Sequence, residues 1–337
     1  MEPPAASPHV VAVVLFQGVD AVDVTGPAEV FSTANWLLRQ RGREPRYEVH
    51  HLADRAGPVR TVSGVRLYAD ETFDGWRLTP DTLLVPGGIQ LTDDGPVPVI
   101  DATAVEWIRE AGREARRIVS ICAGTHLTAA AGLLRGHRAT THWSTVDRLA
   151  AEQPLVQVER DPIFVRSGHV WTSAGMTASL DLALALVAED HGAELSLEVA
   201  RIMVMYLQRP GGQSQLSVPL ARSGGGRRDL RDLRSWMGEN LDGDLSVPAL
   251  ASRMSLSERH FARLFLADTG ITPAVFVEQL RIEGARRMVE QTDLLPRQIA
   301  RFCGLGSVET LHRVFRTHLG TTPGEYRRRF RPAQQRL

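Results

Sequence analysis

Short apolar runs alternate with longer helical segments through the first two hundred residues, and this alternation restricts the fold more than any other feature. Runs rich in Val, Ile and Leu occupy residues 10–16, 47–53, 82–85 and 118–121. Such runs indicate strands buried on both faces, as in a parallel sheet covered by helices on each side. We therefore expect an α/β domain with a doubly wound parallel sheet. An antiparallel hairpin is predicted from residues 163–165 and 170–172.

The helices that should cover this sheet follow the strands along the chain. They are predicted over residues 26–41, 103–116, 179–191 and 193–205. Pro27 then falls in the first turn of its helix, where a missing backbone N–H costs nothing.

The length and composition indicate two domains and a cytoplasmic location. A chain of 337 residues exceeds one ordinary compact domain, and 43% apolar with 23% charged residues is typical of a globular protein. Two cysteines cannot form a disulfide framework, and we find neither a signal peptide nor a membrane-spanning apolar run. We assign residues 1–205 to the N-terminal domain, 206–226 to a Gly- and Ser-rich linker, and 227–337 to the C-terminal domain.

The charge is divided unevenly between these domains. Residues 226–337 contain 19 arginines against 13 acidic residues, a charge of +6, so the rest of this neutral chain carries −6. A basic C-terminal domain predicts contact with a polyanion. This domain is expected to be all helical, with segments at 230–240, 247–254, 256–269, 273–291, 296–303, 307–319 and 323–330. The expected N-terminal caps are Ser246, Ser255, Thr272 and Thr322.

Two segments of the C-terminal domain look like copies of one helix-turn-helix unit. Each has a short helix, a break of three or four residues, and a second helix in which an arginine precedes a phenylalanine by two positions. These pairs are Arg263 with Phe265 and Arg313 with Phe315. The second helix of such a unit fits the major groove of double-stranded DNA.

The markers FARLF at 261–265, TGITP at 269–273 and TTPGEYR at 321–327 make residues 228–330 resemble the AraC-type DNA-binding domain. In that family two helix-turn-helix units share a long central helix, here 273–291. The resemblance implies DNA-facing side chains at Arg259, His260, Arg263, Val308, Glu309, His312 and Arg313. Arginine can donate to guanine and glutamate can accept from cytosine, although each arginine can instead contact phosphate or only solvent.

Cys122 lies where an apolar strand meets a small-residue segment with helical spacing. A strand, a sharp turn and a helix form a nucleophile elbow, and a helix N-terminus lowers the pKa of a thiol. Gly87 and Gly88 follow another strand, so their backbone N–H groups reach the same edge of the sheet, where such sheets bind ligands. We expect Cys122 to be more reactive than Cys303, which lies among apolar residues.

Residues 8–190 resemble the DJ-1/PfpI superfamily in LVPGG at 84–88, ICAG at 121–124, TTHW at 140–143 and TSAG at 172–175. The tandem of this flavodoxin-like domain with an AraC-type domain is similar to the GlxA-type transcriptional regulators. Many hydrolytic members place a histidine directly after the cysteine, where this chain has Ala123. Isocyanide hydratases use an acid at the position of Asp23. Asp23 either hydrogen-bonds Cys122 or only caps or braces the following helix.

The missing histidine favours a ligand-sensing regulator over an enzyme. An active Cys-dependent amidase or hydratase fused to a DNA-binding domain is the alternative, and a redox sensor acting through Cys122 is a third. We expect a ligand site formed by Asp23, Gly87, Gly88, Cys122 and Ala123, with no metal or other cofactor. The expected partners are double-stranded operator DNA, an unidentified small-molecule effector and a second copy of the chain, bound through the N-terminal domain.

Overall fold

The computed structural model describes residues 8–44, 46–93, 95–205, 208–216, 228–319 and 321–330. The chain divides between Gln215 and Leu216 into two compact units. Of the predicted linker 206–226, residues 206, 207 and 217–226 lie outside the described residues, whereas residues 208–215 pack with the N-terminal unit. None of the described helices is both long and apolar enough to span a membrane.

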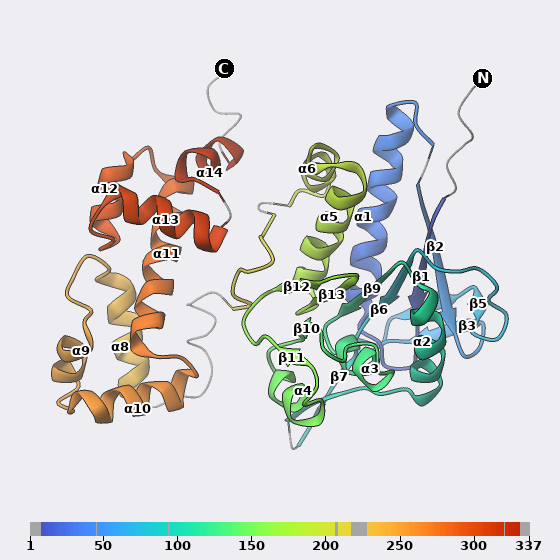
Figure 1. The fold of residues 1–337 in the computed structure, drawn as a ribbon, viewed down its shortest axis with the longest axis horizontal. Coiled ribbons are helices and arrows are strands. Elements are labelled where there is room, and N and C mark those ends of the chain that lie inside the picture. The colour runs from blue at the N-terminus through green and yellow to red at the C-terminus, as the bar shows by residue number, and fades with distance from the viewer. Residues whose placement is uncertain are drawn as a thin grey trace. The chain divides into compact units, whose positions relative to one another are not determined.

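The N-terminal unit is built on a seven-stranded sheet in the order β12-β13-β9-β6-β1-β2-β5 (Figure 1). Neighbouring strands are parallel except β12 and β13, which form the predicted antiparallel hairpin. The strands are β1 His9–Val14, β2 Tyr47–Ala53, β5 Glu71–Thr72, β6 Thr82–Val85, β9 Arg117–Ile121, β12 Phe164–Ser167 and β13 Val170–Ser173. The predicted doubly wound α/β fold is confirmed.

Helices cover both faces of this sheet (Figure 1). On one face α1 (Ala21–Gln40), α5 (Thr177–His191) and α6 (Ala193–Ile202) pack together; on the other lie α2 (Ala102–Glu114) and α3 (Gly124–Ala130). The smaller elements are α4 Val146–Glu152 and three two-stranded pairs, β3 Gly57–Arg60 with β4 Arg66–Ala69, β7 Ile89–Thr92 with β8 Gly95–Pro98, and β10 Arg138–Ala139 with β11 Gln157–Val158.

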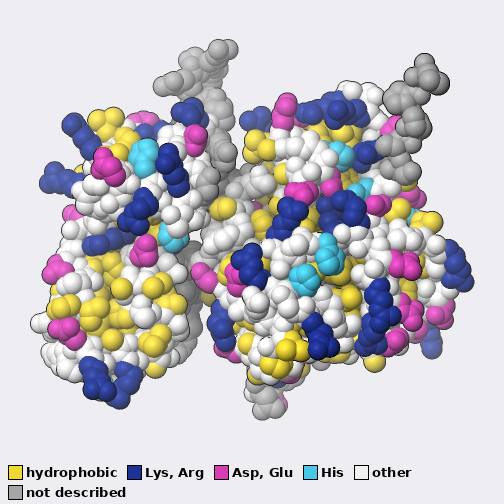
Figure 2. All heavy atoms as spheres, in the orientation of Figure 1, with side chains coloured by type: hydrophobic (Ala, Val, Ile, Leu, Met, Phe, Trp, Pro, Cys, Tyr) yellow, Lys and Arg dark blue, Asp and Glu magenta, His cyan; other side chains and the backbone are white. Residues whose placement is uncertain are grey.

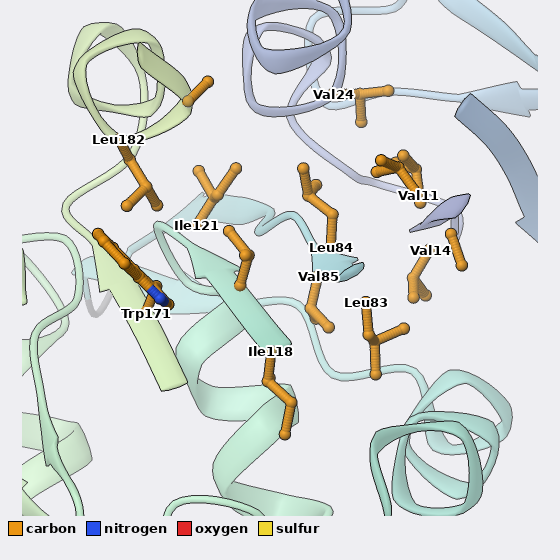
Figure 3. Close-up of a cluster of buried hydrophobic side chains, with 14 of the residues drawn as sticks. Val11, Val14, Val24, Leu83, Leu84, Val85, Ile118, Ile121, Trp171 and Leu182 are labelled. Carbon is orange, nitrogen blue, oxygen red and sulfur yellow. The ribbon is translucent and has the colours of Figure 1, made fainter. Parts of the chain in front are cut away.

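The core extends to both sides of the sheet. Leu84 points to the same side as Val24 and Leu182 of the helices α1 and α5, whereas its neighbours Leu83 and Val85 point to the opposite side (Figure 3). All these side chains are buried. Consecutive strand residues therefore enter hydrophobic layers on alternate faces, which explains the unbroken apolar runs.

The start of α1 differs from the prediction. The helix begins at Ala21, five residues before the predicted Gly26, so Pro27 lies inside it. A proline within a helix removes one backbone hydrogen bond without having to end the helix, which is why Pro27 misplaced the predicted start. The additional turn carries Asp23.

The C-terminal unit is entirely helical, as predicted. The central helix α11 (Pro273–Gln291) contacts helices from both helix-turn-helix units. Ser246 and Thr272 cap their helices as predicted, and Thr322 accepts a hydrogen bond from the backbone of Glu325 (3.2 Å). The other helices are α8 Arg228–Glu239, α9 Val247–Arg253, α10 Glu258–Thr269, α12 Pro296–Phe302, α13 Val308–Leu319 and α14 Pro323–Phe330.

The predicted start of α10 was wrong by two residues. Ser257, rather than Ser255, accepts the capping hydrogen bond, which comes from the backbone N–H of His260. Ser255 has a backbone φ of +54°, in the left-handed region, and therefore belongs to the turn between α9 and α10.

Candidate ligand site and nucleic-acid interface

Cys122 occupies a strained turn between β9 and α3. Its φ is +56°, although it is not a glycine, and its side chain is fully buried. The backbone N–H donates to the carbonyl of Ser173 (2.9 Å), and its own carbonyl accepts from the hydroxyl of Thr141 (2.8 Å). A Cβ atom on Gly175 would lie only 2.1 Å from the Cβ of Cys122, so the two backbone segments can approach only because residue 175 is glycine.

The first turn of α1 brings two carboxyl groups to this cysteine. One oxygen each of Asp20 and Asp23 and the sulfur of Cys122 lie within 4.8 Å of one another. Oδ1 of Asp23 accepts from the backbone N–H of Met176 (2.7 Å), while Oδ2 of each carboxyl group has no hydrogen-bond partner among the described residues. Asp23 therefore does not cap α1. Its carboxyl group is positioned at the thiol, between α1 and the start of α5.

The surroundings raise the pKa values of all three groups. Burial raises the pKa of Asp23 to about 7, despite the hydrogen bond from the backbone of Met176, and burial raises the pKa of Asp20 to about 6. Burial and the negative charges of Asp23 and Asp20 raise the pKa of the Cys122 thiol well above its usual range. The predicted lowering of this pKa was wrong, because desolvation and two carboxyl groups outweigh the helix N-terminus.

Of the other predicted ligand-site residues, Gly87 and Ala123 lie at the elbow, whereas Gly88 lies apart from it. A Cβ atom on Gly87 would lie 2.4 Å from the backbone nitrogen of Ala123, so these two residues are in close contact. The backbone of Gly87 also lowers the pKa of the Asp23 carboxyl group in part. Gly88 instead packs against the backbone of Gly18, where a Cβ atom would lie 2.0 Å from the carbonyl oxygen.

This arrangement places a protonated thiol beside two buried carboxyl groups. Asp20, which was not among the predicted site residues, lies three residues before Asp23, and that spacing places both groups on one side of a helix. The three donor atoms are close enough to hold a metal ion, the one such group found among the described residues. Metal binding would require their deprotonation, which the raised pKa values of all three groups oppose.

The two predicted recognition helices present polar faces to solvent. On α10, Arg259, His260 and Arg263 are all exposed, whereas Phe261 and Phe265 are buried against the unit's core. Figure 2 shows basic side chains (dark blue) at the end of the C-terminal unit where α10 lies. Among the described residues, Arg263 has no ion-pair partner. Its guanidinium group is therefore available to an external anion or base.

The second recognition helix, α13, has a shallow groove along its outer side. The predicted residues Val308, Glu309, His312 and Arg313 line this groove, together with Arg316 and Thr317. Backbone and Ser307 hydrogen bonds hold the pKa of Glu309 below its usual value, so it is ionised and accepts hydrogen bonds. Arg316 extends the basic surface one turn beyond Arg313 and was missed, although it is three positions further along the same helix.

Comparisons with known proteins agree with both halves of this description. The DJ-1/PfpI family model matches residues 9–189, and a helix-turn-helix domain model matches residues 250–329. The chain belongs to the DJ-1/PfpI family. Its family domain is followed by an AraC-type helix-turn-helix domain, as predicted.

Two transcriptional regulators match most of the chain. The chain is 31% identical to the HTH-type transcriptional regulator CdhR of Pseudomonas aeruginosa, over 83% of this chain and 82% of that protein. It is 28% identical to the HTH-type transcriptional regulator GlxA of Rhizobium meliloti, over 85% and 86%. Isonitrile hydratase of Pseudomonas putida is 32% identical over 58% of this chain and 78% of that enzyme. The proteins similar to this chain thus include both regulators and an enzyme.

Proposed function

We propose that this protein regulates transcription by binding specific double-stranded DNA through its C-terminal unit and a small molecule through its N-terminal unit. Two helix-turn-helix units with exposed recognition helices carry the proposal. Regulators that match along more than four-fifths of the chain support it. Mapping the protein's binding sites across its host genome tests it, since a regulator should occupy a limited set of promoters that share one sequence pattern. Uniform occupancy, or none, would refute it.

The small-molecule site is proposed at Cys122, Asp23, Gly87 and Ala123, with Asp20 added to the predicted residues. Gly88 is left out of it, because Gly88 packs against Gly18. The unpartnered oxygens of Asp20 and Asp23 favour a ligand that donates hydrogen bonds, because a buried polar atom without a partner costs about 1–3 kcal/mol. A ligand need only bind one state of the regulator better than another to change its DNA affinity.

We propose that the site binds without catalytic turnover. No histidine follows Cys122, and the thiol is held in its protonated form, which is a poor nucleophile. One observation favours the alternative: the Asp23 carboxyl group beside Cys122 has a pKa near neutrality, which suits proton transfer in a hydratase.

Incubation with an alkyl isonitrile separates these two functions. Hydration converts the isonitrile to the N-substituted formamide, which NMR detects directly. The proposal predicts no formamide above the background reaction. Formamide formation that is lost in Cys122→Ser would establish the hydratase.

The protein is further proposed to act in the cytoplasm as a homodimer. Two linked DNA-binding units gain affinity through effective concentration, which suits a regulator that reads paired half-sites. We place the dimer contact in the N-terminal unit. Sedimentation of the full chain and of residues 1–216 should then give dimers for both at micromolar concentration. A dimeric chain with a monomeric fragment would move the contact to the C-terminal unit.

A further inference from the structure

Residues 208–215, here called the strap, pack on the N-terminal unit and belong to neither proposed binding surface. The strap lies antiparallel to the segment before β12, with a bridge between Pro162 and Ser214. The backbone N–H of Ile163 donates to the carbonyl of Gln213 (2.9 Å). The strap is therefore the last described part of the chain that is attached to the N-terminal unit, thirteen positions before α8 begins at Arg228.

One end of the strap is tied to α5 close to the Cys122 site. Arg209 donates to the carboxyl group of Asp181 from its backbone nitrogen (2.7 Å) and from Nε (2.8 Å), and the Asp181 side chain is only 1% exposed. The Arg209 guanidinium group also donates to the hydroxyl of Thr177 (3.0 Å). Thr177 directly follows Met176, whose N–H binds Asp23. Met176 is therefore the one residue between Thr177, which binds Arg209, and the Asp23 carboxyl group beside the thiol.

The other end is tied to the opposite side of the same site. Nε2 of Gln215 lies within hydrogen-bonding distance of the carbonyl of Thr141 (2.9 Å) and the hydroxyl of Thr140 (3.2 Å). The hydroxyl of Thr141 donates to the carbonyl of Cys122 (2.8 Å). Gln215 therefore binds Thr141, and Thr141 in turn binds the strained backbone of Cys122.

We propose that the strap couples the Cys122 site to the DNA-binding unit, with Arg209 and Gln215 as positioning residues. A ligand that displaces Met176 or the Cys122 carbonyl acts on one or both ties, and so on the chain that enters the DNA-binding unit. This inference rests on the proposed function. Coupling between two sites is reciprocal, so loosening the strap must also loosen the cysteine turn.

Alkylation by iodoacetamide of the full chain measures this reciprocal effect without DNA. Gln215→Ala should increase the labelling rate of Cys122 about fivefold or more, while Cys303, in the other unit, keeps its rate. Ser214→Ala is the matched control, because among the described residues the Ser214 hydroxyl binds only Asp161 (2.5 Å). This variant should leave the labelling of Cys122 unchanged. Equal Cys122 rates in Gln215→Ala, Ser214→Ala and wild type would overturn the proposal.

A second variant distinguishes the loss of a strap contact from a loss of folding. If Gln215→Ala also exposes Cys303, the pair Asp181→Asn with Arg209→Gln replaces it, since an amide pair keeps a hydrogen bond while removing the ion pair. This variant should again accelerate labelling at Cys122 alone. Unchanged labelling there would overturn the tie at Arg209.

DNA affinity supplies the second readout, using a duplex selected by the full chain from a random-sequence library. Carbamidomethylation of Cys122 by iodoacetamide should change the Kd of the wild-type protein for this duplex about fivefold or more. The same modification should leave the Kd of Gln215→Ala unchanged. An equal change in both proteins would overturn the coupling through the strap. If neither protein binds any duplex, the proposed function fails, and the labelling rates still decide whether the strap holds the cysteine turn.

Discussion

The Cys122 thiol is flanked by carboxyl groups, and this makes its reactivity testable at the scale of single residues. Iodoacetamide reacts with thiolates, so a thiol with a raised pKa should react slowly at pH 7.5. Asp23→Asn removes a negative charge that raises this pKa. We therefore predict faster labelling of Cys122 in Asp23→Asn than in wild type, measured by mass spectrometry of the Cys122 peptide.

Cys303 is the internal reference for this measurement. It is also fully buried, and burial raises its pKa to about 11, but it lies in the other unit. Its labelling rate should be the same in both proteins. Slower labelling of Cys122 in Asp23→Asn would show instead that Asp23 accepts the thiol proton, as the hydratase alternative requires.

Asp23 also predicts a pH dependence of stability. Its folded-state pKa of about 7 lies above the ordinary value of 3.8, so the folded state binds the proton more tightly. The protonated Asp23 carboxyl group therefore contributes fully to the free energy of unfolding below pH 3.8. This contribution is lost as the pH rises to about 7. Asp23→Asn should gain unfolding free energy relative to wild type between pH 5 and 8. Urea unfolding at several pH values measures this difference, and a constant difference contradicts the assignment.

The residues of the site were only partly predictable from the sequence. The elbow at Cys122 followed from the strand, the turn and the small residues after it. Asp20 was missed because Pro27 placed the helix start too late, so no helical spacing was applied to residues 20 and 23. The protonation state could not follow from the sequence, since it depends on burial and on charges from a helix a hundred residues away.

At the scale of secondary-structure elements, the turn after β13 must hold a glycine. Gly175 has φ +85°, and a Cβ atom there would meet Cys122, whereas Gly64 has the same φ with nothing within 4 Å. Gly175→Ala should therefore lower the free energy of unfolding by about 1–3 kcal/mol more than Gly64→Ala, because only the first adds a clash to the backbone strain. Equal losses in urea unfolding would show that the cysteine turn tolerates displacement.

The recognition helices predict a contrast between base and phosphate contacts. Arg263→Ala and Arg313→Ala should each cost about 1–3 kcal/mol of binding to the selected duplex and relax the preference at one base pair. Arg113→Ala, an exposed arginine on α2, should change neither. Equal weakening on all sequences, with a shallower salt dependence, would reassign an arginine to phosphate.

Elements were more predictable than their ends. Apolar runs identified the main strands, and capping residues identified most helices of the C-terminal unit. The errors at α1 and α10 arose where two local signals compete: a proline that a helix can contain, and two serines of which only Ser257 has the extended backbone of a cap.

At the scale of the whole molecule, two units with different chemistry share one chain. The N-terminal unit encloses its titratable groups at Cys122, and the C-terminal unit exposes its arginines on recognition helices. The strap is attached to the first unit by contacts that reach both sides of the cysteine turn. The predicted domain limits 1–205 and 227–337 leave the strap out of both domains, and we propose that the N-terminal domain extends to Gln215.

Selection of duplexes from a random-sequence library by the full chain tests the central claim most directly. A sequence-specific regulator should enrich one pattern and bind it about a thousandfold or more tighter than a scrambled duplex of equal length at about 150 mM salt. Arg263→Ala and Arg313→Ala should reduce this ratio. Selection that yields no shared pattern, or equal affinity for the selected and scrambled duplexes, would contradict the account.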